Sequence, residues 1–172
     1  MGDRRHMKGK PVPGRQALRR GRVSVENTAY FLTTCTAGGR PLFAEGTCGE
    51  TVVEVLGWLR GKGRIWLLGY LVMPDHVHVA LVLRSDSTLP GVVKSFKGFA
   101  SWRLHVEVGV AGPVWQPGFY DQAVRDLARA WEVLEYVRGN PVRKGLCESP
   151  EEYPFSSANL ARWGQVDWWW LE

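Results

Sequence analysis

The sequence lacks any apolar run of the roughly 18 residues that a membrane-spanning helix needs. Its N-terminus is basic and has no apolar signal core. Cysteine is scarce: only Cys35, Cys48 and Cys147 occur, with no Cys-x-x-Cys pair, which argues against a disulfide framework or a zinc knuckle. We therefore expect a cytoplasmic protein with free thiols in a reducing compartment and without a membrane segment.

The composition, 45% apolar and 23% charged over 172 residues, is typical of one globular domain with a real core. We expect a basic arm at 1–25, a domain at 26–158 and an aromatic tail at 159–172 that packs on the domain. The net charge of +5 is compatible with a polyanionic partner. The cations of the arm suit phosphate contacts, although a solvated tail is the alternative: Arg4, Arg5, Lys8, Lys10, Arg15, Arg19, Arg20 and Arg22.

Hydrophobic periodicity and turn residues indicate alternating strands and helices. Thr47-x-x-Glu50 fits a capping box, and Asp126 fits a helix N-cap. In chain order we expect a strand at 30–36, a helix from 47 to 61, strands at 65–73 and 76–83, a helix from 89, a further strand within 114–124 and a helix from 127 to 138. The strand at 65–73 is apolar on both faces and is expected to be central. The order predicts an α+β fold, an antiparallel sheet with helices on one face, of the ferredoxin-like or RNA-recognition type.

His76 and His78 open the strand at 76–83. Side chains alternate along a strand, so both imidazoles point to one face, roughly 6–7 Å apart. A shared metal ion would offset the cost of placing them on an apolar strand. The pattern alone is weak, because half-exposed or hydrogen-bonded histidines share it. Metallo-β-lactamase and cupin sites are excluded, since residues 80–83 are all apolar where those sites need acidic or histidine ligands.

Six motifs occur in a fixed order between about residues 28 and 158: Tyr30–Thr36 with Arg40-Pro-Leu-Phe, Tyr70–His78, Ser95–Phe99, Trp115–Asp121, Asn140–Leu146 and Pro150–Ala158. Together they resemble the IS200-like single-tyrosine transposases, and the last three resemble the REP-associated branch of that family. The resemblance implies an HUH-type fold and a DNA-processing enzyme.

The resemblance also assigns roles. It implies that His76 and His78 hold a divalent ion, Mg²⁺ or Mn²⁺. It implies that Tyr120 is the nucleophile of a single-stranded DNA endonuclease and strand transferase, forming a 5′-phosphotyrosine intermediate. The implied substrate is REP-type hairpin DNA with a single-stranded recognition sequence at its foot.

The third metal ligand is less defined than the other two. Members of the REP-associated branch often carry His two residues after the tyrosine, where this chain has Gln122. Insertion-sequence transposases place a Gln or similar polar ligand four residues after the tyrosine, where Val124 stands. We therefore expect Gln122 to ligate through its amide oxygen, with Asp121 and Asp75 as alternatives.

Several cations are candidates for DNA contacts, although a solvated surface would look the same in the sequence. They are Lys97, Arg125, Lys94 and Arg103, together with Arg19, Arg20 and Arg22 of the arm. The competing function is a non-catalytic single-stranded or hairpin DNA-binding module of the same fold, and a more distant one is a phosphodiesterase that activates water. The resemblance to the REP-associated branch favours a monomer over a homodimer.

Overall fold

The computed structural model describes residues 28–84, 87–124 and 126–171. The basic arm with Arg19, Arg20 and Arg22, and also Arg125, lie outside the described residues. The main elements are β1 (Ala29–Cys35), α1 (Gly46–Gly61), β2 (Ile65–Met73), β3 (His76–Leu83), α2 (Leu89–Arg103), β4 (Tyr120–Val124), α3 (Leu127–Arg138) and the short α4 (Asn140–Arg143).

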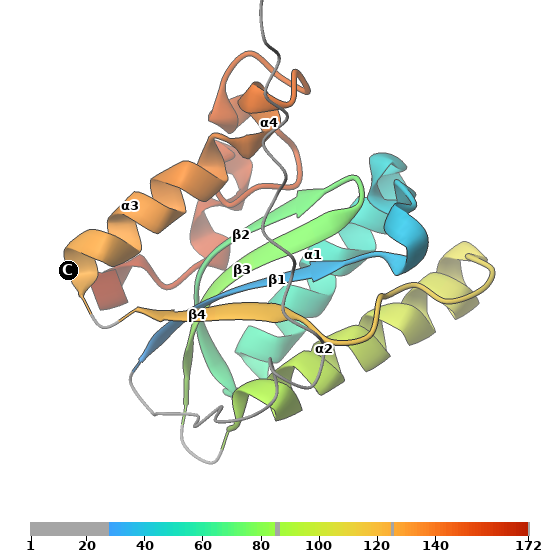
Figure 1. The fold of residues 1–172 in the computed structure, drawn as a ribbon, viewed down its shortest axis with the longest axis horizontal. Helices are drawn as coiled ribbons and strands as arrows, with labels where there is room; N and C mark the ends of the chain where they lie inside the picture. Colours follow the sequence, from blue (N-terminus) through green and yellow to red (C-terminus); the bar gives the residue numbers. More distant parts are fainter. Residues whose placement is uncertain (1–27, 85–86, 125, 172) are drawn as a thin grey trace, which may run out of the picture.

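One four-stranded sheet organises the chain in the order β2-β3-β1-β4 (Figure 1). Its three neighbouring pairs are all antiparallel. With α1 between β1 and β2, and α2 between β3 and β4, this is the ferredoxin-like arrangement. The predicted α+β class is confirmed.

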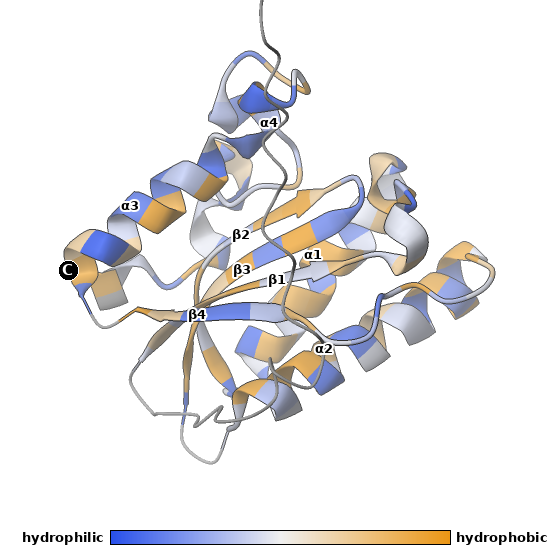
Figure 2. Ribbon diagram, in the orientation of Figure 1, coloured by the Kyte–Doolittle hydropathy of each residue, from blue (hydrophilic) through white to orange (hydrophobic). Residues whose placement is uncertain are grey.

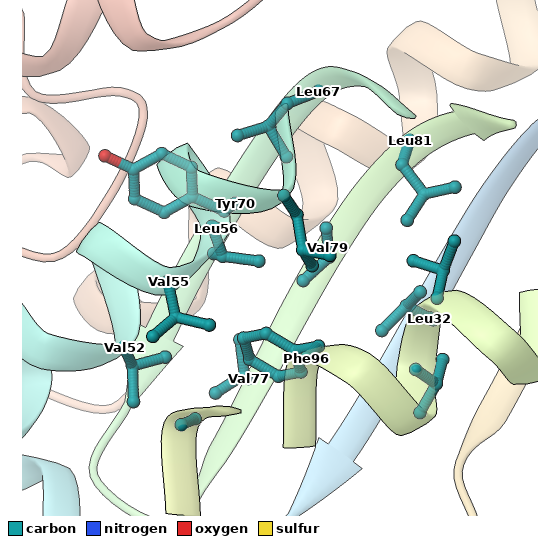
Figure 3. Packing of buried hydrophobic residues seen from close by; sticks show 14 of the residues in the cluster. Leu32, Val52, Val55, Leu56, Leu67, Tyr70, Val77, Val79, Leu81 and Phe96 are labelled. Atoms are coloured by element: carbon teal, nitrogen blue, oxygen red, sulfur yellow. The ribbon is translucent and has the colours of Figure 1, made fainter. Parts of the chain in front are cut away.

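Helices cover both faces of the sheet. Figure 3 shows the main core, where Leu56 of α1 and Phe96 of α2 meet Val79 of β3. A smaller cluster on the opposite face joins Phe31 of β1 to Leu134 of α3. The expectation that the helices share one face therefore holds for α1 and α2 but is wrong for α3. Helix α3 buries few apolar residues, and the sequence alone does not indicate which face of the sheet they cover.

Strand β2 is an edge strand, which corrects the expectation that it is central. The C-terminal segments run along its outer edge: Val72 N donates to Phe155 O at 2.9 Å, and Ser157 N donates to Tyr70 O at 3.0 Å. Farther along, Asp167 N donates to Leu67 O at 2.7 Å. Because this chain segment buries the edge, β2 has the continuous apolar sequence of a central strand.

Asp167 fixes the last part of the chain to this edge. Its buried carboxylate accepts hydrogen bonds from Leu67 N at 2.8 Å and from Arg60 Nη2, also at 2.8 Å. Leu171 then reaches the smaller apolar cluster beneath α3. Asp167 and Leu171 therefore hold the end of the described chain against the sheet.

The predicted helix starts are partly right. Thr88 caps α2 by accepting from Gly91 N at 3.2 Å, and Asp126 caps α3 by accepting from Ala128 N at 3.0 Å. The capping box at Thr47 is wrong, because α1 begins at Gly46 and has Glu45 as its N-cap without a side-chain cap. None of the helices in the described part of the chain is long and apolar enough to cross a membrane.

Candidate functional site on the α3 face of the sheet

The two histidines lie side by side on the face that α3 covers. Their ring centroids are 4.8 Å apart, with the rings nearly perpendicular, so the sequence prediction that they share a face is confirmed. In the sheet register Tyr120 of β4 lies opposite Thr33 of β1, and Thr33 lies opposite His78 of β3. Directly paired residues on antiparallel strands point to the same face, so these three side chains form one row.

Each imidazole is oriented through its Nδ1 atom. Asp75 Oδ1 lies 2.6 Å from His76 Nδ1, and Thr33 Oγ1 lies 2.8 Å from His78 Nδ1. Burial, with a smaller contribution from neighbouring His76, lowers the pKa of His78 to about 4. His78 is therefore neutral at physiological pH, and its Nε2 lone pair is available if Nδ1 carries the proton.

Helix α3 and the turn after it bring a further group to His78. Asn140 Nδ2 lies 3.4 Å from His78 Nε2, and Asn140 Oδ1 accepts from Arg143 Nη2 at 2.8 Å. The Arg143 guanidinium also lies over the Tyr136 ring, 4.3 Å from its centroid. Arg143 therefore joins Tyr136, near the end of α3, to Asn140, at the start of α4.

Gly69 permits the close approach of α3 to the sheet. A Cβ at this position would lie 2.8 Å from Leu134 Cδ2, closer than side chains normally come. A larger residue at this position would require the Leu134 side chain to move. The glycine therefore lets Leu134 of α3 pack directly on β2.

A cleft of about 520 Å³ lies between α3 and the sheet, and we call it the α3 cleft. Hydrophilic residues along β4 and at the start of β3 interrupt the apolar sheet there (Figure 2). We call the part beside His78, Asn140 and Tyr136 the histidine end. The cleft is lined by Phe31, Thr33, Gly69, His78, Ala80, Tyr120, Gln122, Arg129, Glu132, Val133, Leu134, Tyr136 and Val137, with backbone of adjoining strand residues.

The three candidates for a third metal ligand, Asp75, Asp121 and Gln122, occupy different positions relative to the histidines. No set of three His, Cys, Asp or Glu side chains in the described parts of the chain could hold a metal ion. The Asp75 carboxylate is in contact with His76, and Asp121 pairs with Leu32, a residue of the opposite face. Gln122 lines the cleft, two residues along β4 from Tyr120, which is in the row of His78. Asn140, which the sequence analysis did not select, is the amide nearest to His78.

The three predicted DNA-contacting cations that the structure describes, Lys97, Lys94 and Arg103, do not lie at the histidine end. Lys97 Nζ donates to Gln116 O and Gly118 O at 2.7 and 2.6 Å, and burial lowers the pKa of this lysine to about 8. Arg103 pairs with Glu54 and Glu107, while Lys94 is exposed on α2, across the sheet from the histidines. Arg143 is the cation beside the site, and its position in the motif Asn140–Leu146 was the available signal.

Comparison with known proteins decides the family. A family model described as "Transposase IS200 like" matches residues 24–140. The chain belongs to the IS200-like transposase family. This transposase is 25% identical over 126 residues to the ISDra2 transposase TnpA of Deinococcus radiodurans, and the match covers 70% of this chain and 89% of that protein.

Solved structures of transposases share the fold of this IS200-like transposase. A REP-associated tyrosine transposase bound to a REP hairpin superposes with a TM-score of 0.68 at 20% identity, covering 85% of this chain and 86% of that one. A crystal structure of a putative transposase from Deinococcus radiodurans R1 has a TM-score of 0.50 at 23% identity, covering 70% and 96%. The family establishes a DNA-processing transposase, and the structural matches establish its fold.

Proposed function

We propose that this transposase is a metal-dependent single-stranded DNA endonuclease and strand transferase that acts on REP-type hairpin DNA through a 5′-phosphotyrosine intermediate. One observation carries the proposal: His78 and two tyrosines line the same cleft, and His78 is in contact with the His76 ring and the Asn140 amide. A metal ligand pair beside a phenol is the arrangement that phosphoryl transfer to tyrosine requires.

Tyr136 is the better candidate for the nucleophile than Tyr120, which the sequence resemblance selected. Tyr136 precedes Asn140 by four residues, which is the tyrosine-to-ligand spacing of insertion-sequence transposases, whereas Tyr120 precedes the apolar Val124 by four. Tyr120 also stands two strands from His78, about 10 Å between the strand axes. Both phenols are well exposed, at 64% for Tyr136 and 60% for Tyr120, so a DNA strand can reach either.

The reaction is a transesterification. The tyrosine oxygen forms a bond to phosphorus, the bond from phosphorus to the 3′-oxygen breaks, and the 3′-oxygen leaves with a proton. The phosphotyrosine retains the ester bond, so another 3′-hydroxyl can reverse the step without ATP. Arg143, beside the Tyr136 ring, is placed to contact a non-bridging phosphate oxygen.

The residues present fit a divalent ion at the histidine end. Neutral His78 and Asp75-oriented His76 would supply two nitrogen ligands. The amide of Asn140, turned so that its oxygen faces the rings, would supply a third more directly than Gln122, which stands two strands away on β4. When bound, Mg²⁺ or Mn²⁺ would neutralise developing charge on the scissile phosphate.

The DNA substrate is proposed from the family and from the cleft. The similar REP-associated transposase is bound to a REP hairpin, and a hairpin with a single-stranded foot is the substrate we propose here. A narrow cleft beside the histidines admits a single strand, whose bases are unpaired and can be read. We further propose that the protein acts in the cytoplasm as a monomer, which sedimentation of the pure protein tests.

Covalent trapping tests the proposal and the choice of tyrosine. A hairpin oligonucleotide library with a randomised single-stranded flank is incubated with protein and Mn²⁺, and the adduct is detected by denaturing electrophoresis and peptide mass spectrometry. We expect an adduct on Tyr136 that Tyr136→Phe abolishes. The matched variant Tyr120→Phe should retain it. An adduct on Tyr120 would restore the sequence assignment, and cleavage without any adduct would indicate an activated-water nuclease.

A non-catalytic DNA-binding module is the competing function. It is favoured by the lack of a third acidic, cysteine or histidine ligand near the histidines in the described residues. Under that function hairpin DNA binds equally well with Mn²⁺ and with chelator, and no strand is cut. Measuring cleavage and binding on the same oligonucleotides separates the two.

A further inference from the structure

The α3 cleft continues past the histidine end into a part that the phosphoryl transfer does not use. Tyr120 and Gln122 of β4 form one wall, Arg129 and Glu132 of α3 form the other, and Phe31 lies between them. We propose that this part of the cleft binds one nucleobase, from a nucleotide joined to the scissile phosphate, and that the Gln122 amide reads the edge of that base. The inference rests on the proposed strand cleavage only for the position of the phosphate.

The register of the sheet places the base site next to the phosphate site. Gln122 lies opposite Phe31, and Phe31 lies opposite Ala80. These three residues form one row on the cleft face, and the next row on that face consists of Tyr120, Thr33 and His78. Residues two apart on a strand share a face and lie roughly 6–7 Å apart. Gln122 is also two strands, about 10 Å, across the sheet from His78, so a nucleotide with its phosphate at His78 must extend across β1 and along one such row for its base to reach Gln122.

The walls of this part of the cleft combine an aromatic ring with a polar amide. Tyr120, which is 60% exposed, offers aromatic surface, and stacking on aromatic side chains is the usual way that proteins hold unpaired bases. The Gln122 amide has both a donor and an acceptor, a combination that matches the paired N6 and N7 positions of adenine. Pockets for small molecules range over about 300–1,000 Å³, and the cleft, at about 520 Å³, has room for a nucleotide.

Charged groups border the open rim of this part of the cleft. Arg129 Nη1 and Glu132 Oε2 are 2.5 Å apart, and both side chains are more than half exposed. Glu132 can accept from the amino group of a base, and Arg129 can contact the next phosphate of the strand. This ion pair at the mouth of the cleft therefore suits a nucleotide, whose base can form hydrogen bonds within the cleft while its negatively charged phosphate remains at the rim.

Selection by binding tests the base site without requiring cleavage. The hairpin library with the randomised flank is bound to the protein in the presence of EDTA, and the retained strands are sequenced. We expect enrichment of one base, with adenine favoured, at one flank position, and about a tenfold loss of that enrichment in Gln122→Ala. Gln122→Glu should shift the preference toward cytosine, whose edge offers an amino donor. The matched variant Gln116→Ala, an exposed glutamine outside the cleft, should keep the wild-type profile.

The cut position then relates the selected base to the chemistry. When cleavage is mapped with Mn²⁺, the Gln122-dependent position should be one of the two that flank the cut. A Gln122-dependent preference farther from the cut, a Gln122→Ala profile equal to that of the wild type, or no enrichment in any position would overturn the inference. A Gln122-dependent preference in a protein that cuts no DNA would retain the base site and overturn the nuclease proposal instead.

Discussion

One face of the sheet lies against α1 and α2 and holds a continuous apolar layer, whereas the other carries both histidines, a row of polar side chains and the α3 cleft. The same strands supply both faces, because successive side chains alternate. In β3, Val77, Val79 and Leu81 are buried in the main core, while His76 and His78 point to the opposite face, where His78 lines the cleft. Residues that stabilise the core therefore alternate along the strand with residues of the candidate site, and the two sets of side chains point to opposite faces.

The contrast also explains why α3 packs less completely than the other two main helices. Only Ala130 and Leu134 of α3 are buried, whereas α1 buries eight residues. A helix that filled its face of the sheet would leave no room for a DNA strand. The cleft exists because α3 does not fill the space above this face of the sheet.

The largest effect is expected from removing a histidine on the cleft face. His78→Ala deletes a proposed metal ligand. Removing a residue that only orients a metal ligand typically lowers metal affinity or activity 10–100-fold, so removing the ligand itself should lower the cleavage rate by at least about a hundredfold. The free energy of unfolding should change little, because the main core is on the other face. Single-turnover cleavage and urea unfolding measure the two quantities. Cleavage at the wild-type rate would remove His78 from the reaction.

Leu81→Ala tests the packed face. Leu81 is 1% exposed in the main core, and such truncations lower the free energy of unfolding by about 2–5 kcal/mol. Cleavage per folded molecule should be unchanged, since the side chain points away from the cleft. Leu134→Ala on α3, in the smaller cluster and beside the open cleft, provides the matched truncation and should cost less. Equal losses from the two variants would contradict the contrast between the faces.

The titration of His78 should make stability depend on pH. An unfolded histidine takes up a proton below about pH 6.5, whereas burial lowers the pKa of folded His78 to about 4. Between these values the unfolded chain binds more protons, so the free energy of unfolding falls as the pH is lowered, by at most about 3 kcal/mol. Urea unfolding from pH 7 to 4 with chelator measures this. His78→Gln should have a correspondingly shallower dependence, and identical curves would exclude His78 as the cause.

Thr33→Val tests whether the Thr33 hydroxyl orients His78 on the cleft face. Thr33 Oγ1 contacts His78 Nδ1 at 2.8 Å, and valine keeps the shape of the side chain but loses the hydroxyl. Loss of such an orienting contact should reduce cleavage by about 10–100-fold, with recovery at higher Mn²⁺ if metal affinity is what changed. A rate equal to that of the wild type at limiting Mn²⁺ would contradict the proposed orientation.

The smallest effect is expected from the next residue, on the packed face. Thr34 is 1% exposed, and its buried Oγ1 has no hydrogen-bond partner among the described residues. Thr34→Val removes an unpaired polar atom from the core, so the protein should become more stable by about 1 kcal/mol. Cleavage should not change. A loss of stability in thermal unfolding would indicate that the hydroxyl has a partner in solution.

Short-range information in the sequence was sufficient for most of the elements. The bounds of β2 and β3 were predicted correctly, because Pro74-Asp75 separates two apolar runs and leaves room only for a tight antiparallel return. The common face of His76 and His78 followed from the period of a strand. The edge position of β2 was missed, because the segment that covers it lies more than 80 residues later in the chain.

The sequence by itself determined the family, the order of strands and helices, and the pairing of the two imidazoles, since each depends on adjacent residues or on motifs kept in order. Only the tertiary structure decided which other groups surround them. Asn140, Tyr136 and Arg143 are about 60 residues from the histidines. Asn140 reaches His78, with Arg143 and Tyr136 beside it, because α3 crosses this face of the sheet. How near a helix comes to a strand depends on side-chain packing between distant segments, which no local pattern encodes.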